Sequence, residues 1–255
     1  MKMVYKIFFY FVCLVLISAQ FIFDAEYFNI FSKPWHMQSF AHEDSLSSFI
    51  KDHYKFFDKK KLYPKFVDSS KSVVNILVDA WGLSMDDSLV KQDFAIFESL
   101  PHENVVHNRL LNFNTHAEKV EMRNGYENSI YLFGGDSLEY GRMTYIPQLG
   151  FSSSLYCQNC TDHEMADKVD SILNANTSTN LPMFIGLTTW SSRGGNRDSL
   201  LSSLKIFAEL AAKHSGVVFL IQGTHRPILG SPETRRKFYA HWVPAVAINV
   251  EDSVK

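Results

Sequence analysis

The sequence predicts an α/β domain with a mostly parallel central sheet flanked by helices, preceded by an N-terminal membrane helix. Short apolar runs rich in β-branched residues, which suit strands buried on both faces of a parallel sheet, alternate with segments of helical period. The chain has 255 residues, of which 46% are hydrophobic, so it can form one sizeable domain with a packed core and an appendage.

The first predicted strand, Val73–Val78, is a nearly continuous apolar run that ends abruptly at Asp79, with Gly82 three residues later. In open α/β sheets, ligands gather at the carboxyl ends of the strands, so a carboxylate at this position is well placed to hold a metal or a reacting group. The alternative is that Asp79 only opens a turn or caps the next helix. This stretch alone leaves both interpretations open.

Further elements alternate along the rest of the chain. The predicted helices carry apolar residues three or four positions apart, and the predicted strands are short apolar runs. The helices are expected at residues 86–100, 115–124, 162–173, 199–214 and 232–242, and the strands at residues 105–113, 129–133, 183–189, 217–221 and 243–250. In the last strand, Pro244 suits an edge position, because proline cannot donate a hydrogen bond to a sheet ladder.

A signal-anchor is predicted at residues 1–23. Lys2 and Lys6 precede the main apolar block, and Asp24 and Glu26 follow it. This charge bias favours an N-terminus on the inner side of the membrane and export of the remainder. We favour an uncleaved anchor over a cleaved signal peptide, because the apolar block approaches the roughly 20 residues that span a bilayer. The α/β domain is then membrane-anchored on the extracytoplasmic side, or secreted if the segment is cleaved.

Residues 24–70 are predicted to form a juxtamembrane linker and residues 71–255 the α/β domain, with the boundary near residues 68–70. A formal net charge of −2 gives no global electrostatic footprint for nucleic acid. The predicted anchor makes the membrane an expected partner, and the low net charge excludes nucleic acid.

Cys157 and Cys160, in the sequence CQNC, are the only pair of cysteines outside the apolar N-terminal segment. In an oxidising compartment, this pair can close a small disulfide. Two free thiols rank second and a metal site third, because His163 is the only obvious further ligand nearby. A redox motif of this type would normally follow a strand at a helix N-terminus, and the sequence pattern shows no such context.

Polar groups follow three of the predicted parallel strands, and the carboxyl ends of parallel strands meet at one edge of a sheet. A carboxylate, an imidazole and hydroxyls suit a divalent metal, and arginine suits an oxyanion. The alternative is that these are ordinary loop residues. The groups are Asp79, then Thr188, Thr189, Ser191, Ser192 and Arg193, and finally Gly223, Thr224, His225 and Arg226.

Thr115 is the candidate nucleophile. Thr115 and Glu118 fit a capping box at the start of a helix, where unpaired N–H groups also stabilise a bound anion. A threonine beside a metal that lowers the pKa of its hydroxyl can attack a phosphate or sulfate ester. Ser84 is the competing candidate, since it lies closer to Asp79 in the sequence.

Six segments occur in an order that resembles a known family: NILVDAWG, THAEKVEMRN, YLFGGDSLEYGRMTYIPQLGF, FIGLTTWSS, FLIQGTHRPIL and FYAHWVPAVAIN. Together, over about residues 72–249, they resemble membrane-anchored members of the alkaline phosphatase and sulfatase superfamily, close to the phosphoglycerol and phosphoethanolamine transferase branch. The resemblance implies that Asp79 and His225 bind a divalent metal ion (Mn, Mg, Ca or Zn) and that Thr115 is the nucleophile. Arg193 or Arg226 would steady the transferred group.

The chain also departs from the family pattern. Thr224 stands beside His225 where the family has an aspartate, and Trp190 stands where it often has a histidine. Asp136 and Asp162 are possible substitutes for the missing carboxylate. Two hypotheses therefore stand. The first is a metal-dependent hydrolase or transferase acting on a phosphorylated or sulfated lipid or glycan of the cell envelope, and the second is a catalytically inactive binding or scaffold module of the same fold.

Overall fold

A computed structural model describes residues 10, 46–57, 70–112, 126–135, 151–176, 181–189, 196–227 and 232–250. The chain divides into two units, Met1–Asp44 and Ser45–Lys255, and every described residue except Tyr10 belongs to the second. Within the described residues, no helix has the length and apolar character needed to cross a bilayer. The predicted signal-anchor at residues 1–23, apart from Tyr10, and the predicted helix at residues 115–124 lie outside the described residues, so both stay predictions.

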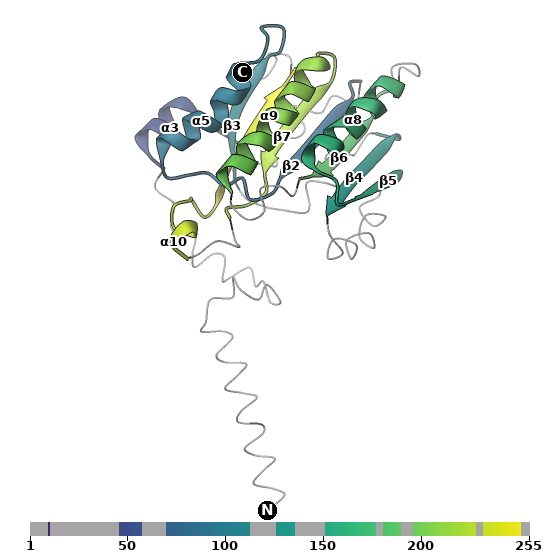
Figure 1. The fold of residues 1–255 in the computed structure, drawn as a ribbon. Coiled ribbons are helices and arrows are strands. Elements are labelled where there is room, and N and C mark those ends of the chain that lie inside the picture. Colours follow the sequence, from purple (N-terminus) through teal and green to yellow (C-terminus); the bar gives the residue numbers. More distant parts are fainter. Residues whose placement is uncertain are drawn as a thin grey trace, which may run out of the picture. The chain divides into compact units, whose positions relative to one another are not determined.

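The second unit is built on an eight-stranded sheet with the order β1-β3-β8-β7-β2-β6-β4-β5 (Figure 1). Neighbouring strands run parallel, except that β8 is antiparallel to both β3 and β7. This confirms the predicted mostly parallel sheet. The strands are β1 (Lys55–Phe57), β2 (Val73–Val78), β3 (Val106–Asn112), β4 (Ser129–Gly135), β5 (Ser153–Gln158), β6 (Phe184–Thr188), β7 (Val218–Gly223) and β8 (Trp242–Ile248).

Helices α5, α8 and α9 pack over one face of this sheet (Figure 1). Side-chain caps mark where two of them begin: Asp86 accepts a hydrogen bond from the backbone of Ser88, and Asn196 accepts one from Asp198. Both helices begin within two residues of the start that the sequence predicts. The helices are α3 (Ser48–His53), α5 (Asp87–Glu98), α8 (Asp162–Asn176), α9 (Arg197–Lys213) and α10 (Pro232–Arg235).

The two faces of the sheet have separate cores. The helices bury Phe94, Phe97 and Phe207 completely against the first face. The second face carries an apolar cluster that, within the described residues, contains no helix residue, so the prediction of flanking helices is confirmed for the first face only. Near its centre lies a buried polar pair, in which Gln222 Nε2 donates to Asn75 Oδ1 at 2.8 Å.

The last strand corrects a prediction. Residues 243–250 were expected at an edge because of Pro244, whereas β8 lies inside the sheet between β3 and β7. Its ladder with β7 ends at Ala245, next to Pro244, so proline is not required to pair with β7. The helix expected at residues 232–242 is likewise too long, since α10 is one turn and Trp242 already belongs to β8.

The α/β unit begins earlier than the predicted boundary near residues 68–70. Leu46, Ile50 and Tyr54 are buried in the core beneath the helices, and β1 pairs in parallel with β3. Ser47 caps α3 and also donates to Asp87 Oδ1 at 2.7 Å. Residues 46–57 are thus part of the folded domain, because their apolar side chains pack against it.

Replacing Ile50 with alanine tests this boundary. Ile50 is fully buried, so we expect the free energy of unfolding to fall by about 2–5 kcal/mol. Urea denaturation of the full-length chain measures the change. The matched control is Lys51→Ala, an exposed neighbour on the same helix, for which we expect a change within about 0.5 kcal/mol. Equal small effects for the two variants would show that α3 is not part of the cooperative domain.

Candidate functional site

The candidate site lies where β2 and β7 end side by side. These parallel strands pair up to Val78 and Gly223, so the next residues, Asp79 and Thr224, leave the sheet together at its carboxyl edge. Thr189 follows β6 on the other side of β2, and its Oγ1 accepts a hydrogen bond from the backbone of Asp79 at 3.3 Å. The predicted convergence of three strand ends is therefore present.

The segment after β7 supplies two side-chain contacts to the Asp79 carboxylate. Thr224 Oγ1 donates to Asp79 Oδ1 at 3.1 Å, and His225 Nε2 lies 2.9 Å from the same oxygen. Asp79 is 8% exposed, so these partners replace most of the water that would otherwise solvate its carboxylate. Of the six predicted site residues, the structure thus brings Asp79, Thr224 and His225 into contact.

The contacts of His225 fix how its ring is protonated. Nδ1 lies 2.7 Å from the backbone carbonyl oxygen of Arg226, which can only accept, so Nδ1 carries a hydrogen. Nε2 then faces Asp79 Oδ1 at 2.9 Å. Metal-bound histidines in proteins have the same outer contact, in which one ring nitrogen donates to a carbonyl and leaves the other for the metal.

The residues fit part of a divalent-metal site. Asp79 Oδ1 and His225 Nε2 would hold the cation, and Thr224 would add a weak hydroxyl ligand. Within the part of the chain that the structure describes, no group of three or more His, Cys, Asp or Glu side chains gathers. The described residues therefore provide two strong ligands and not a complete set.

Two of the other candidates have structural roles. Asp162 is buried and accepts a hydrogen bond from Ser203 Oγ, which joins α8 to α9, so no contact places it beside Asp79. Ser84 is also buried, and its Oγ accepts from the backbone of Asp86 at 3.1 Å in the turn before α5. Ser84 is therefore explained by the turn.

The remaining candidates divide between one that the structure places and several that it does not describe. Arg226 follows His225, and its backbone packs so closely on Gly82 that a Cβ at Gly82 would lie 2.6 Å from the Arg226 Cα. The other candidates lie outside the described residues: Thr115, Asp136, Trp190, Ser191, Ser192 and Arg193.

The loop after Asp79 interlocks with the loop after β7. Ala80 has a φ of 57°, which is uncommon for a residue with a Cβ. Trp81 then turns back into the core, and a Cβ at Gly223 would overlap the Trp81 carbonyl oxygen. Both glycines, Gly82 and Gly223, are thus required for close backbone approach.

A buried polar network, which was not predicted from the sequence, holds Trp81. The indole Nε1 donates to Asp93 Oδ2 at 3.0 Å, and Arg197 Nη1 lies 2.6 Å from Asp93 Oδ1. Burial raises the pKa of Asp93 to about 6, although Arg197 and the indole act in the opposite direction. The network ties α5 and α9 to the loop that carries Asp79. One indication of this network was present in the sequence, because Asp93 lies on the apolar face of a predicted helix.

The raised pKa of Asp93 predicts a pH-dependent stability. The folded protein binds this proton more tightly than the unfolded chain, so the stabilisation is present below about pH 4 and is lost as pH rises through about 6. The total loss is up to about 3 kcal/mol. We expect Asp93→Asn to remove this part of the pH dependence, because the amide does not ionise, as measured by urea denaturation from pH 4 to 7. The exposed Asp52→Asn variant should keep the wild-type profile; an identical profile for Asp93→Asn would contradict the assignment.

Comparison with known proteins supports the fold. No protein-family model and no curated protein matches the sequence. The lipoteichoic acid synthase LtaP from Listeria monocytogenes aligns with a TM-score of 0.51 and 11% identity, over 73% of this chain and 67% of that one. A protein in the alkaline phosphatase superfamily from Vibrio parahaemolyticus aligns with a TM-score of 0.45 and 11% identity, over 74% of this chain and 62% of that one. At such low identity the likeness to LtaP shows the fold alone, so the predicted resemblance is confirmed at the level of the fold.

Proposed function

We propose that this chain is a membrane-anchored, metal-dependent hydrolase or transferase that acts on a phosphate or sulfate ester of a cell-envelope lipid or glycan. The observation that supports it most is the meeting of Asp79 and His225 at the carboxyl edge of the sheet, with the His225 ring oriented by the carbonyl of Arg226. A lipoteichoic acid synthase with the same fold favours an envelope polymer as the class of substrate.

In this proposal Asp79 and His225 hold the divalent cation, with Thr224 as a weak third ligand. The bound cation would polarise the ester and lower the pKa of the attacking hydroxyl. Thr115 supplies that hydroxyl from the start of its predicted helix, whose N–H groups favour an anion. Arg226 lies on the same loop as His225, and it and Arg193 would neutralise the transferred group.

Metal binding tests the ligands directly. Asp79→Asn and His225→Gln each remove one of the few strong ligands, so we expect at least about ten-fold weaker Mn²⁺ or Zn²⁺ binding for each. Metal content of the purified full-length chain after equilibrium dialysis measures the change. The matched control is Asp162→Asn, which removes a buried carboxylate away from the site and should retain wild-type binding. Unchanged binding in both site variants would remove Asp79 and His225 as ligands.

The role of Thr115 has its own test. With p-nitrophenyl phosphate, bis-p-nitrophenyl phosphate and p-nitrophenyl sulfate as probes, we expect Thr115→Ala to lose at least about 100-fold in rate, whereas Thr115→Ser retains a hydroxyl and part of the activity. Intact-protein mass spectrometry after acid quenching should detect a phosphoryl or sulfuryl group on wild type and none on Thr115→Ala. Undiminished turnover in Thr115→Ala would exclude it as the nucleophile.

The second candidate function is a catalytically inactive binding or scaffold module of the same fold. It is favoured by Thr224, whose neutral hydroxyl contacts Asp79 where a second carboxylate would add charge for a hard cation. A chain that retains no stoichiometric metal and hydrolyses none of the three probe esters would support this function over the enzymatic one.

A further inference from the structure

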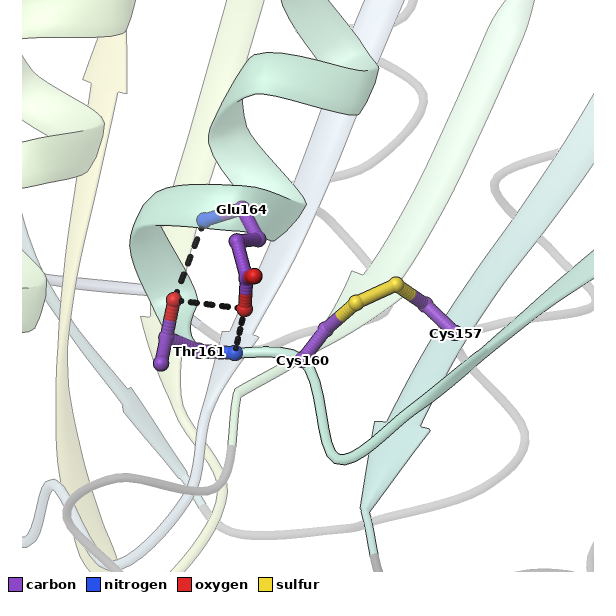
Figure 2. Close-up of a disulfide and its surroundings, with 4 residues drawn as sticks. All are labelled: Cys157, Cys160, Thr161 and Glu164. Atoms are coloured by element: carbon purple, nitrogen blue, oxygen red, sulfur yellow. Dashed lines mark hydrogen bonds between the residues drawn. A yellow bond between two sulfur atoms is a disulfide. The ribbon is translucent and has the colours of Figure 1, made fainter.

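The structure places the CQNC sequence between a strand and a helix, which the sequence pattern did not reveal. Cys157 is the penultimate residue of β5, the chain turns through Asn159 with a φ of 55°, and Cys160 precedes α8 by two residues. Cys157 and Cys160 form a disulfide across this turn (Figure 2). The expected disulfide is confirmed, and the strand–CxxC–helix arrangement associated with redox motifs is also present.

Hydrogen bonds hold the turn on the helix side. Thr161 and Glu164 form a capping box, in which the Thr161 backbone donates to Glu164 Oε2 at 2.8 Å and the Glu164 backbone donates to Thr161 Oγ1 at 3.2 Å (Figure 2). On the strand side, Gly134 of β4 allows the Cys157 carbonyl to approach, since a Cβ there would lie 3.2 Å from that oxygen. Opening the disulfide would therefore leave the backbone of the turn held by other contacts.

Stabilisation alone is a weak reason for this bridge. A crosslink stabilises mainly by restricting the unfolded chain, and the effect is smallest for short loops. Cys157 and Cys160 are three residues apart, so their crosslink closes one of the shortest loops that a disulfide can close.

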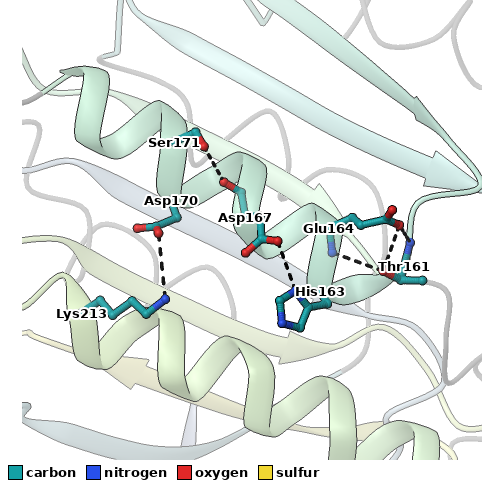
Figure 3. Close-up of polar contacts among 7 residues, drawn as sticks. All are labelled: Thr161, His163, Glu164, Asp167, Asp170, Ser171 and Lys213. Atoms are coloured by element: carbon teal, nitrogen blue, oxygen red, sulfur yellow. Dashed lines mark hydrogen bonds and ion pairs between the residues drawn. The ribbon is translucent and has the colours of Figure 1, made fainter.

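The disulfide borders a groove large enough for a ligand. The groove has a volume of about 470 Å³, which is within the usual range for binding sites. Both cysteines line it. Its apolar residues are Leu155, which is 40% exposed, and Ile172, and its cation is Lys168. The acidic and hydroxyl groups on the α8 side are Glu164, Asp167 and Ser171 (Figure 3).

We propose that Cys157–Cys160 is a redox-active disulfide that exchanges with a dithiol carried by a protein or peptide seated in this groove. The open, partly apolar groove suits a peptide segment, whereas a small thiol would use little of it. The site is separate from Asp79, because β6 and β4 lie between β2 and β5 and place the two strand ends about 14 Å apart.

The exchange conserves atoms and electrons. A partner thiolate attacks Sγ of Cys160, the more exposed of the two cysteines, and the Cys157–Cys160 bond breaks with its electron pair leaving on Cys157 Sγ, which takes up a proton. The second partner thiolate then attacks the partner sulfur of the mixed disulfide and releases Cys160, which is also protonated. The partner is oxidised to a disulfide, and this chain is reduced to two thiols.

The test compares a macromolecular dithiol with a small one on the folded full-length chain. Reduced thioredoxin and dithiothreitol are the probes, and alkylation followed by mass spectrometry counts the thiols formed while near-ultraviolet circular dichroism monitors the fold. We expect Leu155→Glu to slow reduction by thioredoxin at least ten-fold and to leave the dithiothreitol rate unchanged. The matched control is Leu181→Glu, another exposed leucine that does not line the groove, which should change neither rate.

Single cysteine variants test the order of attack. Cys157→Ser keeps the thiol of Cys160, and Cys160→Ser keeps that of Cys157, which is 8% exposed. We expect Cys157→Ser to form a mixed disulfide with oxidised glutathione at least ten-fold faster than Cys160→Ser. The proposal is overturned if thioredoxin reduces the wild-type disulfide only after the chain unfolds, if Leu155→Glu slows both probes equally, or if the two cysteine variants react alike. None of these results depends on metal binding or ester hydrolysis.

Discussion

The close packing of Gly223 on the carbonyl of Trp81 is the constraint on which the site depends. The loops after β2 and β7 can lie this near only because Gly223 has no Cβ. Gly82 is needed for the same reason, because a Cβ there would overlap the backbone of Arg226. His225 lies two residues after Gly223, and Asp79 lies two residues before Trp81. The backbone thus sets the distance between the two proposed ligands before their side chains make any contact.

Two buried carboxylates near this junction have different environments. Asp93 lies in the core, where desolvation outweighs Arg197 and the Trp81 indole, and its contacts tie two helices to the site loop. Asp79 lies at the edge of the sheet, where its carboxylate contacts the Thr224 hydroxyl and the His225 imidazole and its own backbone N–H donates to Thr189. The first carboxylate suits a structural support, whereas the second, with part-buried polar partners at the carboxyl edge of the sheet, suits a ligand.

Local sequence patterns predicted most of this fold and the core of the site. The buried strands β2, β6 and β7 have continuous apolar runs, and the rule that parallel strands end on one edge was enough to bring Asp79 and His225 together. The missed elements lack such patterns. Strand β5 is largely exposed and its apolar and polar residues do not alternate, so the strand before the cysteines was not predicted. The internal position of β8 depends on pairing with strands distant in the sequence. Asp93 was missed because its partners are distant in sequence.

The buried amides Asn75 and Gln222 bear on the alignment of β2 with β7 as well as on the packing of the second face. If β2 slipped by one residue against β7, its side chains would exchange faces. In the native register Asn75 pairs with Leu220 and Leu77 pairs with Gln222, so a slip of two that moved the amides further apart would keep the faces but break their bond, with no water to replace it. Apolar side chains of similar size would tolerate the second error far better. The pair therefore disfavours a slip in that direction, and in the native register the residue after Val78 lies opposite the residue after Gly223.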